Sequence, residues 1–265
     1  MSQANPQVDV FYLNDFITTH RKKHSHDSEF QRRKLLKIAN ELKKVDSIEG
    51  QLAEASIEFH FCNYERGISI LKNVLKLTQN KLAIAWDLLL DAYIQLGDLD
   101  NIFSTYKEYL RVFDDVSDKT RKIYLHIVRV YLMVEFLQEF KLEHSYDTKI
   151  LDNLIDNTRK LENIGISIET YRKFVSLIFK TFYENFKGTI EQSLLFQEND
   201  VVIRVCSSVA NASDLFELNS KYNDQILSWY GSSTDELKVQ IEKIIVYFMH
   251  KNFDSKEEND LRVLA

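Results

Sequence analysis

The chain has 265 residues, 45% of them hydrophobic, with only six glycines and one proline. This composition is typical of a packed globular protein, and so few turn-forming residues disfavour sheets, barrels and Gly-rich nucleotide loops and predict an all-α fold. The formal net charge of −6 disfavours a protein whose whole surface coats nucleic acid or anionic lipid, although it leaves room for local basic patches.

The N-terminal residues 1–19 carry a short apolar group at helical spacing, which suits docking on the body of the protein. Its members are Val8, Phe11, Tyr12, Phe16 and Ile17. This segment lacks the basic and apolar regions of a signal peptide, and no stretch of the chain reaches the ~20 apolar residues of a membrane span. The two cysteines lie far apart, which predicts reduced thiols and not a disulfide framework. We therefore expect a cytoplasmic protein without membrane contact.

Basic residues gather between residues 20 and 44, where nine Lys and Arg stand against three acids. Ser28 and Gln31 have the spacing of a capping box, so a helix is expected to begin there. His20 and His24 would share a helical face, but the neighbouring cations would repel a metal ion, so no metal site is predicted. Six residues of this segment are candidate contacts for a phosphate or an acidic partner: Arg21, Lys22, Lys23, Arg32, Arg33 and Lys34.

From Ser47 onward the chain reads as successive amphipathic helices of about 10 to 20 residues. Residues 121–137 are predicted to form one helix buried on several sides, and residues 167–187 and 189–198 a helix pair. A further helix is expected over residues 237–248, after a capping box at Ser233 and Glu236. The β-branched run Val201–Val205 is the one strand-like rival. Because no second run of this kind offers a pairing partner, we interpret it as a buried helix.

An internal repeat predicts the structure of the middle of the chain. Residues 59–75 return 35 residues later as residues 94–110. In this alignment Cys62 matches Gly97, and Asn63 matches Asp98. A repeat of this length is typical of a pair of helices that stacks on its neighbours.

With these residues in view, the segment 48–116 resembles the tetratricopeptide repeat family, whose unit is a pair of antiparallel helices. In the second repeat of this chain, three large residues stand at the positions where that family has large residues in its first helix: Trp86, Leu89 and Tyr93. Tyr106 matches the aromatic residue of the family's second helix. The first unit has Ala55 and Gly67 at the small positions, whereas Leu90, Ile102, Gln79 and Asp114 depart from the pattern. The resemblance implies a right-handed α-solenoid that degenerates toward the C-terminus. We expect three parts: an N-terminal arm and basic helix (1–45), two repeat-like pairs (46–116) and a degenerate helical continuation (117–265).

A weaker resemblance connects the chain to the helical activator domain of some bacterial transcription regulators, itself a variant of the same repeat. Its pattern can be traced through Leu88, Gly97, Tyr106, Leu110, Thr120, Arg121 and Tyr124. It lacks that family's usual Gly and Pro, and no helix-turn-helix segment accompanies it.

No phosphate loop, nucleophile elbow or metalloprotease helix is present in the sequence, so we predict neither an enzyme nor a cofactor. Stacked helix pairs chiefly bind peptides, helices or domains, which predicts a non-catalytic adaptor or regulatory protein with a protein or peptide partner on a concave surface. The residues expected to contact that partner are Glu58, Asp87, Asp91 and Gln95, with Trp229 and Tyr230 as a possible anchor. The alternative is a transcriptional or signalling regulator that contacts nucleic acid through residues 20–44.

Overall fold

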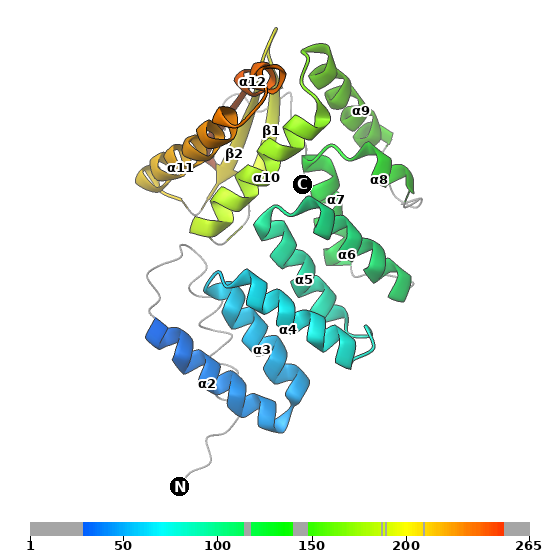
Figure 1. Ribbon diagram of the computed structural model, residues 1–265. Coiled ribbons are helices and arrows are strands. Elements are labelled where there is room, and N and C mark those ends of the chain that lie inside the picture. The colour runs from blue at the N-terminus through cyan, green and yellow to red at the C-terminus, as the bar shows by residue number, and fades with distance from the viewer. Residues whose placement is uncertain are drawn as a thin grey trace. The chain divides into compact units, whose positions relative to one another are not determined.

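The computed structural model describes residues 29–113, 118–139, 148–186, 188, 190–208 and 210–251 (Figure 1). They divide into two compact units, of which the first holds the helices up to residue 113 together with residues 182–188, and the second holds the remainder. The expectations for the N-terminal apolar group, for Arg21, Lys22 and Lys23 and for the cap at Ser28 fall outside the described residues.

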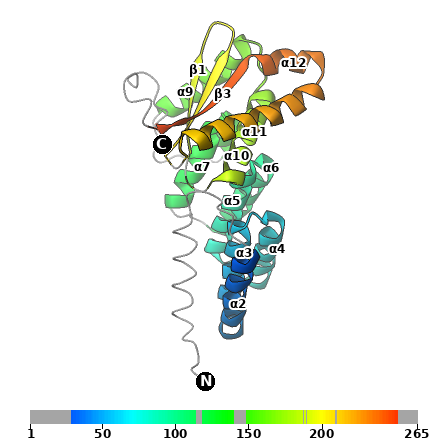
Figure 2. The same cartoon turned by 90° about the vertical axis from the view of Figure 1, so that its left-hand side faces the viewer.

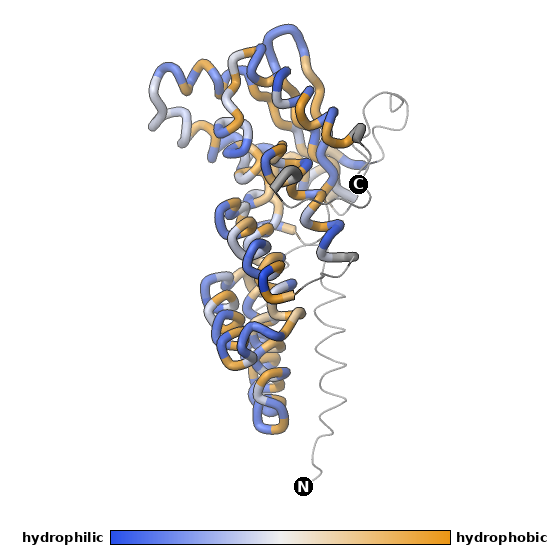
Figure 3. Tube along the Cα trace, turned by 90° about the vertical axis from the view of Figure 1, so that its right-hand side faces the viewer, coloured by the Kyte–Doolittle hydropathy of each residue, from blue (hydrophilic) through white to orange (hydrophobic). Residues whose placement is uncertain are grey.

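The first unit is a series of helices in which each packs against the next. They are α2 (Glu29–Val45), α3 (Ser47–His60), α4 (Tyr64–Leu77), α5 (Ala83–Leu96) and α6 (Leu99–Val112). The Asp46 carboxylate caps α3 by accepting hydrogen bonds from the amides of Ile48 and Glu49, and Asp98 caps α6 through the amide of Asn101. Apolar and polar residues alternate along these helices, as the amphipathic pattern predicts (Figure 3). The predicted sequential helix pairs are therefore confirmed.

The turns inside the helix pairs repeat in atomic detail. Cys62 and Gly97 both adopt the left-handed conformation, with φ of 60° and 64°. The amide of each bonds a carbonyl three residues earlier, and the following amide bonds a carbonyl five residues earlier. This is the Schellman arrangement that ends a helix. The repeat alignment thus identifies a real structural equivalence.

The same turn occurs a third time, again 35 residues on, in the second unit. Leu132 has φ of 52°, and the Met133 amide donates to the Val128 carbonyl at 2.9 Å. The single helix predicted over residues 121–137 is consequently wrong: α7 (Asp118–Val130) ends here and α8 (Val134–Glu139) begins. This turn contains no glycine, so nothing in the sequence indicated a helix end here. Arg172 stabilises the turn by donating from Nε to the Tyr131 carbonyl at 3.0 Å and from Nη2 to the Leu132 carbonyl at 3.1 Å.

Two glycines let the helices of the first unit approach closely. A Cβ on Gly50 would lie 2.5 Å from the backbone nitrogen of Lys43, so α3 can contact α2 there only without a side chain. A Cβ on Gly67 would lie 2.3 Å from the Phe59 ring. Beside these contacts Leu35, Ala39 and Ile57 form a buried core between α2 and α3.

The second unit adds four helices to α7 and α8. They are α9 (Thr148–Asn163), α10 (Ile168–Asn185), α11 (Ala212–Gly231) and α12 (Asp235–Glu242), with the last residues of α10 counted in the first unit. Thr234, and not Ser233, caps α12. Tyr171 on α10 is fully buried and donates its hydroxyl hydrogen to the Val130 carbonyl at 2.8 Å.

The second unit also contains a three-stranded sheet, which corrects the all-α prediction. The strands are β1 (Ile190–Phe196), β2 (Val201–Ser207) and β3 (Ile244–His250), in the order β1-β2-β3. β1 pairs with β2 antiparallel, and β3 joins β2 in parallel, with Val201 opposite Ile244. The β-branched run therefore has two partners, and both lie in segments that the apolar spacing had assigned to helices. An apolar residue at every third or fourth position did not distinguish helix from strand in such short runs.

One face of this sheet is covered and the other is partly open. Val201, Ile203 and Val205 are fully buried, and the Tyr222 ring of α11 packs edge-on against Phe248 at 5.7 Å. On the opposite face, Tyr247 is 53% exposed. Figure 2 shows α11 lying beside β3.

Two residues near the end of the described chain, Gln240 and Lys243, contact the turn between α9 and α10. Gln240 of α12 accepts hydrogen bonds from the Ser167 amide at 2.9 Å and the Thr170 hydroxyl at 2.8 Å. Lys243 donates from Nζ to the Ile164 carbonyl at 2.8 Å, and its own carbonyl accepts from the Val201 amide at 2.9 Å. The bonds of Gln240 with Ser167 and of Lys243 with Ile164 join residues 73 and 79 positions apart. Among the helices that the structure describes, none is both long enough and apolar enough to cross a bilayer.

Candidate functional site

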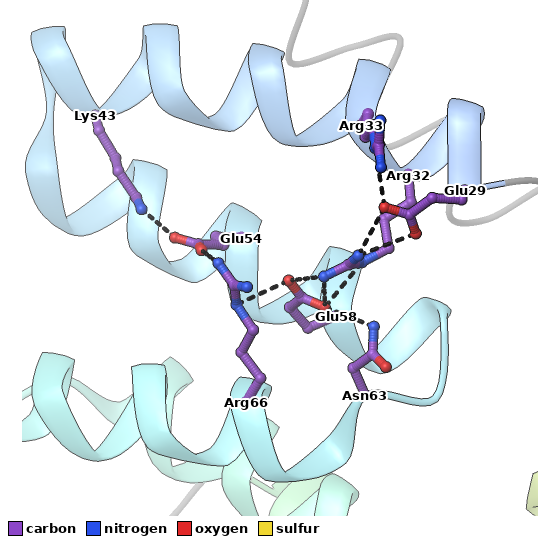
Figure 4. Close-up of polar contacts among 8 residues, drawn as sticks. All are labelled: Glu29, Arg32, Arg33, Lys43, Glu54, Glu58, Asn63 and Arg66. Atoms are coloured by element: carbon purple, nitrogen blue, oxygen red, sulfur yellow. Dashed lines mark hydrogen bonds and ion pairs between the residues drawn. The ribbon is translucent and has the colours of Figure 1, made fainter.

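The most strongly charged arrangement in the first unit is a cluster of ion pairs that joins α2, α3 and α4 (Figure 4). We call it the α2–α4 charge cluster; it comprises Glu29, Arg32, Arg33, Lys43, Glu54, Glu58, Asn63 and Arg66. Its members come from all three helices and, for Asn63, from the residue before α4. The folding of the three helices, and not proximity in sequence, therefore assembles it.

Glu58 is the centre of the cluster, and its side chain is completely buried. Arg32 of α2 donates from Nη2 to Glu58 Oε1 at 2.9 Å and from Nε to Oε2 at 3.1 Å. Arg66 of α4 lies 3.0 Å from Oε1 through its Nε, and Asn63 donates to Oε2 at 2.8 Å. A buried carboxylate is tolerated only when its charge is paired and its lone pairs are satisfied, and both conditions are met here.

A second buried carboxylate, Glu54, lies one turn earlier on α3. It accepts hydrogen bonds from Lys43 of α2 and, at 3.0 Å, from Arg66 Nη2. Burial raises the pKa of Glu54, but the bonds from Lys43 and Arg66 outweigh it, so the pKa lies below its usual value. Arg66 thus bridges Glu54 and Glu58 while α2 supplies a cation to each.

The exposed end of the cluster is Glu29, at the start of α2. It accepts hydrogen bonds from Arg32 at 3.1 Å and from Arg33 at 3.1 Å, and these bonds lower its pKa. Both guanidinium groups belong to residues three and four positions later, the spacing at which side chains meet on one helix face.

The structure places several predicted contact residues inside this cluster. Glu58, which we expected on an outward face, is buried, and Arg32, a predicted phosphate contact, is its principal partner. Arg33 is 77% exposed along its side chain and Lys34 is exposed. The repeat alignment contained a signal for Glu58, because its equivalent in the second helix pair is the buried residue Tyr93.

Five residues of the cluster were not among the predicted contact residues: Glu29, Lys43, Glu54, Asn63 and Arg66. Ion pairs across 11 or 12 residues, such as Lys43 with Glu54 and Glu54 with Arg66, have no recognisable spacing. In addition, Lys44 pairs with Glu41 at 2.8 Å. Much of the positive charge between residues 29 and 44 is therefore neutralised by acids of the same chain.

A different surface carries the other predicted contacts. Ile84, Asp87 and Asp91 share one face of α5, at spacings of three and four residues. Ile84 is 53% exposed, Asp87 is half-buried and Asp91 is exposed. The equivalent positions one repeat earlier, on α3, include Glu49, which is exposed. We call Glu49, Ile84, Asp87 and Asp91 the first-helix face.

Gln95 completes the predicted set on α5 but has a partner within the unit. Its Oε1 accepts a hydrogen bond from the Tyr64 hydroxyl at 2.9 Å. Burial raises the pKa of Tyr64, so this hydroxyl stays protonated and remains a donor. Gln95 therefore ties the end of α5 to the start of α4.

Trp229 and Tyr230 lie in the last turn of α11, in the second unit. The Trp229 ring packs edge-on against Phe174 at 5.3 Å and is partly buried. Tyr230 donates to Glu242 at 2.5 Å, which raises the tyrosine pKa, and Lys238 lies 5.7 Å from its ring centre. Both aromatic residues thus contribute to packing between helices of the second unit.

Within the residues that the structure describes, no group of three or more His, Cys, Asp or Glu side chains is arranged to hold a metal ion. No family model, curated protein or solved structure matches this chain.

Proposed function

We propose that the protein is a non-catalytic adaptor of the cytoplasm that binds a segment of a protein partner on the first-helix face. The observation that supports this most directly is the combination of one exposed branched apolar side chain, Ile84, with the acids Glu49, Asp87 and Asp91 on first helices of successive pairs. Repeated helix pairs display equivalent residues of successive units along one surface.

The chemistry of this face indicates the kind of partner. Two acids beside an apolar side chain on α5, with a further acid on α3, suit a peptide with Lys or Arg residues flanking an apolar residue. Acidic side chains on a binding face also disfavour nucleic acid, and the intramolecular pairing of Arg32, Lys43 and Lys44 reduces the basic surface available to phosphates.

The test is tagged capture of the full chain from its native host, with and without nuclease and at two salt concentrations, followed by mass spectrometry. The variant is Asp87→Asn with Asp91→Asn, and the matched control is Asp152→Asn with Asp224→Asn, which changes the net charge equally at exposed positions. We expect a discrete protein to bind the natural chain and the control, and to bind the first-helix variant about tenfold more weakly, about 1.4 kcal/mol.

Two results would contradict the proposal. Recovery of nucleic acid alone, lost at high salt, would transfer the function to the basic segment 20–44. A protein partner retained equally by both double variants would place the binding surface elsewhere.

A further inference from the structure

The two edges of the sheet in the second unit differ in whether their outward backbone groups have hydrogen-bond partners. Along an extended strand, the N–H and C=O groups of alternate residues point to opposite edges. The Val201 amide donates to the Lys243 carbonyl and the Gln197 amide to the Asp200 carbonyl. These bonds fix which residues of β1 and β3 face β2 and which face outward.

The outer edge of β3 is occupied at Phe248. Phe248 directs its amide and carbonyl away from β2, and the Asn219 side chain of α11 binds both: Oδ1 accepts from the amide at 3.0 Å, and Nδ2 donates to the carbonyl at 3.0 Å. A side-chain amide thereby takes the place that another strand would fill.

The outer edge of β1 lacks such a cover among the described residues. Ile190, Gln192, Leu194 and Phe196 direct their backbone groups away from β2, and none of these groups bonds another described residue. Among the described elements, β2 alone packs along β1. Single side chains make the other contacts to this strand: Lys160 of α9 lies over the Phe196 ring, Gln192 donates to the Tyr171 hydroxyl of α10, and Lys251 pairs with Glu191. Unpaired backbone groups on an ordered strand are a template for another strand.

We propose that the partner of this edge is β1 of a second copy of the chain, paired antiparallel about a two-fold axis at Ser193. In this register Ile190 lies opposite Phe196 of the second copy and Gln192 lies opposite Leu194. Each of the four outward residues then bonds through both its N–H and its C=O, so no outward group of either strand stays unpaired. The two sheets join into one continuous sheet.

The side chains agree with this register. Ile190 and Phe196 form an apolar cross-strand pair at both ends of the interface. Glu191 lies opposite Leu195, so the only charged residue of β1 does not meet its own copy. Ser193 meets Ser193, and this small neutral residue produces neither repulsion nor overlap on the axis. Such self-complementarity is what a two-fold interface requires.

The register predicts which cysteine substitution can form a disulfide between two copies. Ser193 and its copy form a pair that is not hydrogen-bonded, whose Cα atoms lie about 4.5 Å apart in an antiparallel sheet, which is within disulfide range. Leu195 and its copy are offset by four residues along the strands, about 13 Å, which is far too distant. Ser193→Cys should therefore cross-link two copies, and Leu195→Cys should not.

The experiment uses the full chain with Cys62 and Cys206 replaced by serine, and adds Ser193→Cys or Leu195→Cys as the matched pair. Mild oxidation followed by non-reducing electrophoresis should convert most of the Ser193→Cys chain into a covalent dimer and leave the Leu195→Cys chain monomeric. Light scattering of the unmodified chain over a dilution series should show a dimer whose dissociation constant rises at least about tenfold in Ser193→Glu, because two carboxylates would then meet on the axis.

Three results would overturn the proposal: a monomer at every concentration, equal cross-linking of the two cysteine variants, or a dimer unaffected by Ser193→Glu. A chain that is monomeric alone and gains mass only when another protein is added would assign the edge to a foreign strand, which also contradicts self-pairing.

Discussion

Cys62 and Gly97 occupy the same left-handed position in successive helix pairs, 35 residues apart, although only one of them is a glycine. A left-handed conformation costs a residue with a Cβ roughly 1 kcal/mol, whereas glycine adopts it freely. The first pair therefore stores a local strain that the second pair avoids.

This difference predicts opposite effects of exchanging the residues. Cys62→Gly should raise the free energy of unfolding of the first unit by up to about 1 kcal/mol, and Gly97→Ala should lower it by about 1 kcal/mol. Chemical denaturation followed by the fluorescence of Trp86 measures this, in a Trp229→Phe background so that only the first unit reports. A loss of stability in Cys62→Gly would show that the thiol contributes packing that outweighs the strain.

The contact between Gly50 and α2 makes a second prediction. Because an added methyl group would overlap the Lys43 backbone and not a movable side chain, Gly50→Ala should destabilise the first unit by about 1 to 3 kcal/mol. Gly231→Ala is the control, since no atom lies within 4 Å of its added Cβ, and it should be neutral or slightly stabilising. Thermal unfolding of both variants checks this; equal stabilities would mean that α2 and α3 separate without cost.

The centre of the α2–α4 charge cluster predicts a large effect of neutralising Glu58. Glu58→Gln leaves Arg32 and Arg66 without their shared carboxylate, while Glu29 and Glu54 still pair with them, so the loss of the charged hydrogen bonds at Glu58 should cost about 1.5 to 3 kcal/mol. Glu29→Gln removes an exposed acceptor of the same Arg32 and should change stability by less than about 1 kcal/mol. Urea denaturation of the two variants compares them directly, and similar midpoints would refute the central role of Glu58.

Acid should weaken the same cluster through Glu54. Its pKa in the folded protein lies below the ordinary value of 4.5, so its stabilising contribution is complete above that pH and is lost as the pH falls through the lowered folded-state pKa. Stability of the first unit should therefore fall with pH from about 4.5 downward, and Glu54→Gln should reduce this slope. The measurement is the denaturation midpoint by Trp86 fluorescence as a function of pH; an unchanged slope would contradict the prediction.

Sequence periodicity predicted the helix pairs because each helix of the first unit has a clear apolar face and a marked turn. It failed for β3, where Ile244, Ile245 and Phe248 fit helical spacing as well as they fit a strand. It also missed the turn at Leu132, because that residue carries no sign of a left-handed conformation. Long-range contacts, such as the carbonyl bonds of Arg172, hold the chain there.

The charge cluster was the least predictable feature. Arg32 and Glu58 were each recognised as charged residues on helices, but their pairing depends on how α2 crosses α3, which Gly50 permits. Local spacing describes one helix at a time, whereas a buried ion pair between helices is a property of their packing.

The parallel pairing of β3 with β2 has a consequence for synthesis on the ribosome. When β2 has emerged at Ser207, its second neighbour β3 begins only at Ile244, 37 residues later and beyond α11 and α12. Until β3 emerges, the hairpin of β1 and β2 has two bare edges, and the α9–α10 turn lacks its bonds to Gln240 and Lys243. Non-local contacts of this kind slow folding and leave nascent intermediates open to wrong strand pairing. The second unit therefore completes its fold only after nearly the whole described chain has been made, and ribosomes stalled before residue 244 should display a form that chaperones bind.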